Sequence, residues 1–131
     1  MVDPEIISEW VTKADEDFEF ALVNQKEGRP FYAQICFHFQ QSVEKYLKAY
    51  IIAKGLEFIR SHELPLLLDI CLSKDNSFEE LREDCEYLTT FYIETRYPVT
   101  WPMQFTNQES KKCSDAARRI QSFVKKKMGF D

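Results

Sequence analysis

Apolar residues recur along most of the chain at intervals of three and four, the period of an amphipathic helix. The first such stretch follows Asp3 and Pro4, a favoured pair for beginning a helix, and ends before Gly28. This spacing predicts one long helix with a single apolar face. Its apolar positions are Ile6, Ile7, Trp10, Val11, Ala14, Phe18, Ala21 and Leu22.

The next stretch, from about residue 31 to residue 54, is apolar on nearly every face of a helix. A helix with so little polar surface is expected to lie centrally and to contact several others. Gly55 follows it and can adopt the left-handed conformation that ends a helix.

A short third helix is predicted from Glu63 to about Leu72, with Ser61 as its N-cap. Pro65 is tolerated in its first turn, where the backbone amides have no helical acceptor. A fourth helix is predicted to begin with a capping box, Ser77-Phe78-Glu79-Glu80.

The fourth helix should end near Arg96 or Tyr97, because Pro98 disfavours a helical conformation in the residue before it. Residues 98–106 form a predicted loop in which Trp101, Met103 and Phe105 look exposed. A second capping box, Thr106-Asn107-Gln108-Glu109, begins the last helix.

Five helices with short connections and no internal repeat predict an all-α fold, an antiparallel up-and-down bundle. The chain has 131 residues, which suits one domain spanning residues 1–131. Only three glycines are present, too few for a strand-rich fold built on tight turns.

No apolar run approaches the roughly 20 residues that span a bilayer, and the acidic start Met1-Val2-Asp3-Pro4-Glu5 does not resemble a signal peptide. We therefore expect a cytoplasmic protein without a membrane contact. The four cysteines, Cys36, Cys71, Cys85 and Cys113, have no metal-ligand spacing. Buried reduced thiols are the favoured interpretation, a disulfide is the alternative, and neither a metal nor another cofactor is expected.

The net charge of −5 is unevenly distributed. Residues 1–27 hold eight acidic residues against two lysines, whereas residues 107–131 hold seven basic residues against three acidic ones. The basic pairs recur every seven residues and so form one stripe on the last helix: Lys111/Lys112, Arg118/Arg119 and Lys125/Lys126. This stripe is either a solvated face beside an acidic helix or a contact for a phosphate backbone.

Polar residues stand out on the second helix because so little else there is polar. Gln41 and Lys45 are four residues apart, as are Glu44 and Lys48, so each pair lies on one helical face. Exposed, weakly stabilising pairs are one interpretation. A polar groove with a binding role is the other.

Two further segments carry candidate chemistry. Arg96-Tyr97-Pro98 places a guanidinium, the preferred group for phosphate recognition, at the end of the fourth helix. A basic residue there also stabilises the end of the helix. His62 lies in the predicted first turn of the third helix, where a histidine is more often structural than catalytic.

These segments, in this order, resemble the HEPN family, the higher eukaryotes and prokaryotes nucleotide-binding domain. The likeness runs over residues 8–125. It rests on four motifs: Ala14-x-x-Asp17-Phe18-x-x-Ala21, the run from Phe37 to Ala49, His62-Glu63-Leu64 and Arg96-Tyr97-Pro98. The resemblance implies a bundle similar to nucleotidyltransferase substrate-binding subunits, commonly dimeric, with a minimal nucleotidyltransferase as partner, often as toxin and antitoxin.

Other members of the family are metal-independent ribonucleases whose motif is an Arg followed, after four to six residues, by a His. Counted from Arg96, the three permitted positions hold Trp101, Pro102 and Met103. Without an imidazole there, the acid/base group that would move the proton of the 2′-hydroxyl is missing. This chain therefore resembles a member without the ribonuclease motif.

The favoured hypothesis is a non-catalytic module that binds a nucleotide or a nucleotidyltransferase partner. Its candidate site residues are Gln41, Glu44, Lys45, Lys48, Arg96 and Tyr97. Two alternatives stay open. One is a degenerate ribonuclease, with Arg96 and His62 as catalytic candidates acting on RNA phosphate. The other is a homodimeric scaffold without a ligand.

Overall fold

The computed structural model of the chain describes residues 2–94 and 105–130. Within these ranges it contains five α-helices, one 3-10 helix and no strand, which confirms the all-α prediction. They are α1 (Pro4–Lys26), α2 (Tyr32–Ala53), α3 (Leu64–Leu72), the 3-10 helix η1 (Asn76–Leu81), α4 (Arg82–Glu94) and α5 (Asn107–Met128). No helix in this described part of the chain has the length and apolar character needed to cross a membrane.

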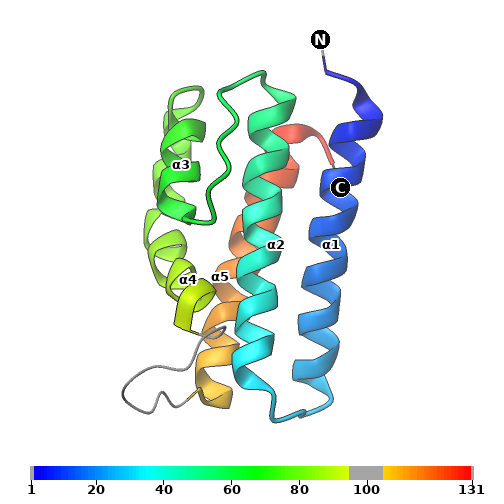
Figure 1. Cartoon of the computed structure of the whole chain (residues 1–131), viewed down its shortest axis with the longest axis vertical. Coiled ribbons are helices and arrows are strands. Elements are labelled where there is room, and N and C mark those ends of the chain that lie inside the picture. Colours follow the sequence, from blue (N-terminus) through cyan, green and yellow to red (C-terminus); the bar gives the residue numbers. More distant parts are fainter. Residues whose placement is uncertain (1, 95–104, 131) are drawn as a thin grey trace.

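The long helices α1, α2 and α5 form one side of the up-and-down bundle; α1 is antiparallel to α2, and α5 lies behind α2 and runs in the same direction in the view of Figure 1. The shorter α3 and α4 flank α2 on the side away from α1. α2 therefore contacts α1, α3, α4 and α5, which confirms the prediction of a central helix. Its nearly continuous apolar surface is explained by these four neighbours.

Tyr46 ties three helices together in the core. Its buried hydroxyl donates to Asp15 of α1 and accepts from Nε2 of Gln121 of α5 at 2.8 Å. Lys125 of α5 completes the group, with its Nζ 2.9 Å from Oδ1 of Asp15. Burial, followed by the hydrogen bond to Asp15, raises the pKa of Tyr46, so the phenol stays neutral.

The outer helices begin as the sequence predicts. Asp3 caps α1 by accepting from the Glu5 amide at 2.9 Å. Thr106 and Glu109 form a complete capping box at the start of α5.

The central helix α2 ends as the sequence predicts. Gly55 has φ of 66° directly after α2, and the amide of the next residue donates to the Ile51 carbonyl at 2.9 Å.

Two predicted N-caps are wrong, although α3 begins only one residue after the predicted Glu63. α3 begins at Leu64, and Ser61 accepts from the Glu63 amide at 3.0 Å in the turn before the helix. The predicted capping box from Ser77 does not exist, because the Asp75 carboxylate accepts from the Ser77 amide at 2.9 Å. The predicted fourth helix is split into η1 and α4.

Phe105 corrects a further prediction. Its side chain is half-buried, and its ring packs against Phe91 of α4 with centroids 5.9 Å apart. It is therefore part of the bundle, not of an exposed loop. Trp101 and Met103 lie outside the described residues.

Residues 56–63 form an irregular segment that returns along α2 from its C-terminal end, coloured green in Figure 1. Phe58 lies beside Lys48, and His62 lies beside Glu44, one turn earlier on α2. This antiparallel course places two side chains of the segment against the polar residues of the central helix.

Candidate functional site

Two charged residues are buried together on α2. Nζ of Lys48 lies 2.8 Å from Oε2 of Glu44, and each side chain is only 7% exposed. The interpretation of this pair as an exposed, weakly stabilising one is therefore wrong. Burying an ion pair carries a desolvation penalty that apolar residues of the same size would avoid, so stability alone does not account for it.

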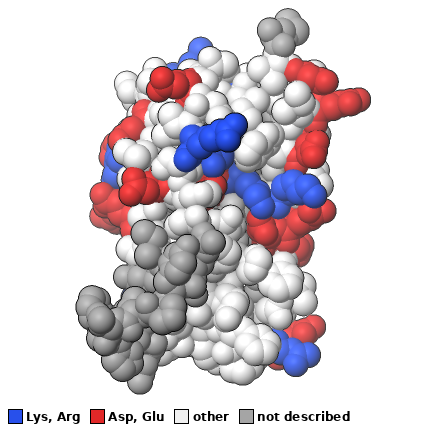
Figure 2. All heavy atoms as spheres, in the orientation of Figure 1, with Lys and Arg blue, Asp and Glu red and all other residues white. Residues whose placement is uncertain are grey.

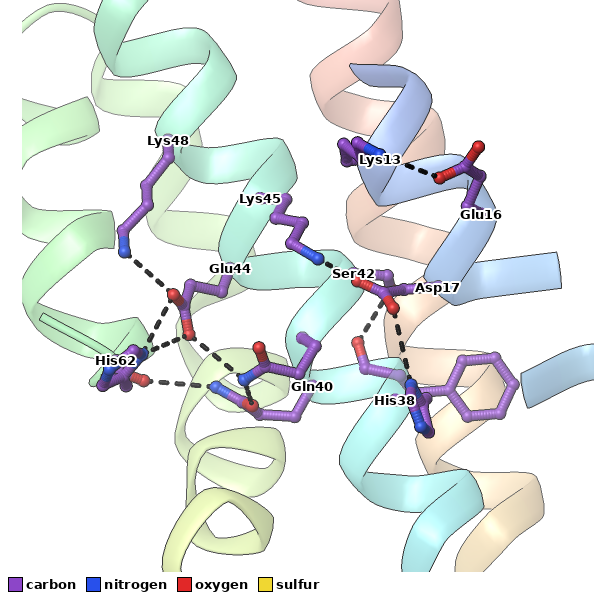
Figure 3. Close-up of polar contacts among 12 residues, drawn as sticks. Lys13, Glu16, Asp17, His38, Gln40, Ser42, Glu44, Lys45, Lys48 and His62 are labelled. Carbon is purple, nitrogen blue, oxygen red and sulfur yellow. Dashed lines mark hydrogen bonds and ion pairs between the residues drawn. The ribbon is translucent and has the colours of Figure 1, made fainter. Parts of the chain in front are cut away.

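His62 reaches the same carboxylate from the return segment. Its Nδ1 lies 3.0 Å from Oε1 and 3.1 Å from Oε2 of Glu44 (Figure 3). Gln40 of α2 donates to the His62 carbonyl at 3.2 Å, which fixes the backbone of the segment. A carboxylate held on one side by an ammonium thus orients an imidazole on the other.

Gln41 completes the polar network. Its Nε2 donates to Oε1 of Gln40 at 2.8 Å and approaches Oε1 of Glu44 at 3.4 Å. On the other side, the ammonium of Lys48 lies 5.7 Å from the centroid of the Phe58 ring, within range of a cation–π contact. The resulting Glu44 site consists of Gln40, Gln41, Glu44, Lys48 and His62.

The imidazole of His62 connects the Glu44 site to the surface. It stacks on the Tyr92 ring of α4, and its side chain is 48% exposed. It lines a hollow of about 490 Å³ between the start of α3 and the end of α4. The other lining residues are Glu63, Pro65, Leu66, Thr89, Thr90 and Tyr92.

The geometry is that of an imidazole oriented by a carboxylate. When Nδ1 carries the proton and donates to Glu44, Nε2 is left as an acceptor for a ligand. The half-exposed ring can then exchange a proton or a hydrogen bond with a bound group. Glu44 and Lys48, being buried, act by holding His62 in place.

Lys45 points away from the Glu44 site. Its Nζ binds Oδ2 of Asp17 on α1, and Nδ1 of His38 lies 3.4 Å from the other Asp17 oxygen. Burial by itself would raise the pKa of Asp17, but the hydrogen bonds from His38 and Lys45 and their charges hold it below its ordinary value of 3.8. This group joins α1 to α2.

The structure therefore brings together Gln41, Glu44, Lys48 and His62 from the predicted set and directs Lys45 to α1. Arg96 and Tyr97 lie outside the described residues. The sequence reasoning missed Gln40, whose side chain holds the His62 carbonyl. A polar residue next to Gln41 on an otherwise apolar helix could have indicated a role for Gln40, because a fully buried side-chain amide requires hydrogen-bond partners.

Three of the six residues of the basic stripe on α5 contact neighbouring helices. Arg119 donates twice to Asp84 of α4, at 2.8 Å each, and Lys125 pairs with Asp15 of α1. The guanidinium of Arg118 lies 5.2 Å from the Phe18 ring. These contacts favour the interpretation of a face beside acidic helices over a contact for phosphates.

Comparisons with known proteins agree with this architecture. A crystal structure of TT1696 from Thermus thermophilus superposes with a TM-score of 0.83 at 29% identity, covering 92% of this chain and 97% of that one. A crystal structure of ST0689, described as an archaeal HEPN homologue, gives 0.74 at 26% identity, covering 92% and 96%. "Putative toxin MJ1304" of Methanocaldococcus jannaschii is 27% identical, covering 92% of this chain and 90% of that protein.

The profile of the HEPN domain matches residues 7–127, which include all six described helices except the ends of α1 and α5. The sequence motifs, the helical bundle and this match agree. The chain belongs to the HEPN domain family.

Proposed function

We propose that the chain is the non-catalytic HEPN subunit of a toxin–antitoxin pair and that its partner is a minimal nucleotidyltransferase. The name of the Methanocaldococcus jannaschii relative supports the toxin–antitoxin part. The main structural support for a binding site is the buried Glu44–Lys48 pair. Glu44 also contacts His62, whose side chain is 48% exposed at the surface. A buried polar network with one exposed member is typical of a binding site, since its conformation is fixed before the ligand arrives.

In this proposal His62 contacts the partner or its nucleotide, and Glu44, Lys48 and Gln41 hold it in position. Arg96 supplies the donors for a phosphate, and Tyr97 supplies a ring for stacking. Arg96 follows Tyr92 by four residues in the sequence, and Tyr92 stacks on His62. We further propose that the subunit acts as a homodimer in the cytoplasm.

Recovery of a nucleotidyltransferase from native extract by the tagged chain tests the proposal. We expect recovery by the wild type and a loss of at least tenfold with His62→Ala, which removes a half-exposed ring. Lys26→Gln, at an exposed position in the last turn of α1, is the matched control. Failure to recover a nucleotidyltransferase, together with no heat of nucleotide binding in calorimetry, would contradict the proposal.

A second candidate function is a metal-independent ribonuclease. The specific observation in its favour is the contact of His62 Nδ1 with both oxygens of a buried carboxylate. In this candidate Nε2 of His62 takes the proton of the 2′-hydroxyl, and Glu44 stabilises the imidazolium that forms. The histidine that the Arg96 motif lacks would then come from the return segment.

A further inference from the structure

A second hollow, of about 370 Å³, opens between α1 and α2. It is lined by Ile6, Glu9, Trp10, Lys13 and Lys45. None of these five residues contributes to the contacts of the Glu44 site given above. The proposed function therefore leaves this hollow without a role.

Aromatic and aliphatic side chains are exposed around this hollow. Trp10 packs edge-to-face on Phe58, with ring centroids 5.9 Å apart and an interplanar angle of 62°. Phe58 is 43% exposed and Ile6 is 47% exposed. Among the described residues, the indole N–H of Trp10 has no hydrogen-bond acceptor. The half-buried indole of Trp10 and the exposed ring of Phe58 offer a flat apolar surface and, at the indole, a free donor.

Two ammonium groups approach the same hollow from facing helices, Lys13 from α1 and Lys45 from α2 (Figure 3). Lys13 contacts Glu16 only at 3.8 Å, and both side chains are more than half exposed, so this pair is easily replaced. Lys45 directs one donor to Asp17, and an ammonium has three. Both lysines therefore retain donors for an anion.

Glu9 adds an acceptor to the rim. Its side chain is exposed, and within the described part of the chain it has no ion pair. Figure 2 shows that basic side chains in the middle of the face viewed there have acidic side chains directly beside them. The hollow thus combines a ring surface, two cations and one acceptor in a small volume.

We propose that this hollow binds a small anion attached to a flat ring, either a phosphate ester or a carboxylate. The ring lies against Trp10 beside Phe58, and the anionic group lies between Lys13 and Lys45. Glu9 accepts a hydrogen bond from a hydroxyl or amino group on the ring. The volume is at the lower end of the range for small-molecule pockets, which suits a ligand of one or two rings. This inference does not rest on the proposed function.

Tryptophan fluorescence tests the inference directly. The chain has two tryptophans, so Trp101→Phe leaves Trp10 as the single reporter. The two probes are adenosine 5′-monophosphate and phenylacetate. Adenosine alone and inorganic phosphate alone serve as controls, because each is one half of the nucleotide probe. We expect a saturable change in Trp10 fluorescence with at least one of the two anionic ring probes. Each half alone should bind at least tenfold more weakly than the nucleotide if the anion is a phosphate.

Substitutions of single lysines show where the probe binds. Lys13→Gln should weaken it about tenfold, as expected for the loss of one charge-assisted hydrogen bond, whereas Lys26→Gln on the same helix should not change it. No saturable change with either ring probe, or equal binding by Lys13→Gln, would overturn the inference. Binding lost in Glu44→Gln but kept in Lys13→Gln would also overturn it, because the ligand would then occupy the Glu44 site. Recovery of a nucleotidyltransferase from extract tests the proposed function, and the fluorescence titration tests this hollow. Either proposal can therefore fail without the other.

Discussion

The imidazole of His62 lies parallel to the phenol ring of Tyr92, with centroids 4.3 Å apart and an angle of 14° between the planes. His62 belongs to the return segment and Tyr92 to α4, so this contact joins two parts of the chain that are distant in sequence. Because the other edge of His62 contacts Glu44, the ring is fixed from two sides. The Glu44 site is thereby connected to α4.

Breaking the buried ion pair should destabilise the fold more than removing it. Lys48→Met leaves the Glu44 carboxylate buried without its ammonium, and we expect a loss of about 3 kcal/mol in the free energy of unfolding. The double variant Glu44→Gln/Lys48→Met should recover most of this loss. Urea denaturation of the wild type, the two single variants Glu44→Gln and Lys48→Met, and the double variant measures the coupling energy between the two side chains. Additive effects of the two substitutions would contradict a buried ion pair.

Acid should remove the stability that Asp17 contributes. Its pKa in the folded protein is lower than its ordinary value of 3.8, so its contribution is fully present above pH 3.8 and is lost as the pH falls through the folded-state pKa. Asp17→Asn should flatten the decline in stability below pH 4. Thermal unfolding between pH 2 and 6 measures this, with Glu16→Gln as an exposed neighbouring control. An unchanged pH slope in Asp17→Asn would contradict the assignment.

The two capping boxes suggested by the sequence should respond differently to mutation. Thr106→Ala removes a cap that the structure contains and should lower stability by about 1 kcal/mol. Ser77→Ala should have an effect within about 0.5 kcal/mol, because Asp75 accepts from the Ser77 amide. Denaturation midpoints of the two variants compare them directly. Equal losses would show that Ser77 also acts as a cap.

The four cysteines should be unreactive in the folded protein. All four are buried, none of them is in a disulfide, and burial raises the pKa of the Cys71 and Cys85 thiols to about 12. A thiol reagent at pH 8 should therefore label none within minutes, and all four after unfolding in urea. Fast labelling of the native protein would contradict the burial of the thiols.

RNA cleavage distinguishes the two candidate functions. Under the favoured one, neither the wild type nor Arg96→Ala, purified identically, cleaves single-stranded RNA. Cleavage that is lost in both Arg96→Ala and His62→Ala would establish a ribonuclease despite the missing motif histidine. Cleavage retained equally in both variants would indicate a contaminating nuclease.

The sequence anticipates much of the helical arrangement, because apolar spacing reports which face of a helix is buried. The starts of α1 and α5 follow from local capping residues, since a cap forms with an amide two or three positions away. The predicted caps of α3 and η1 are wrong because the amides there bind other acceptors. The Leu64 amide donates to Oγ1 of Thr89 of α4 at 3.0 Å, and the Asp75 carboxylate accepts from the Ser77 amide at 2.9 Å.

The sequence by itself determined the fold class, the family motifs and the pairing of Glu44 with Lys48, because helical periodicity fixes residues four apart on one face. Only the tertiary structure decided that this pair is buried, that His62 contacts it and that Lys45 binds Asp17 instead. Burial depends on which elements cover a helix, and the course of the return segment depends on long-range contacts. Neither is encoded in the spacing of neighbouring residues.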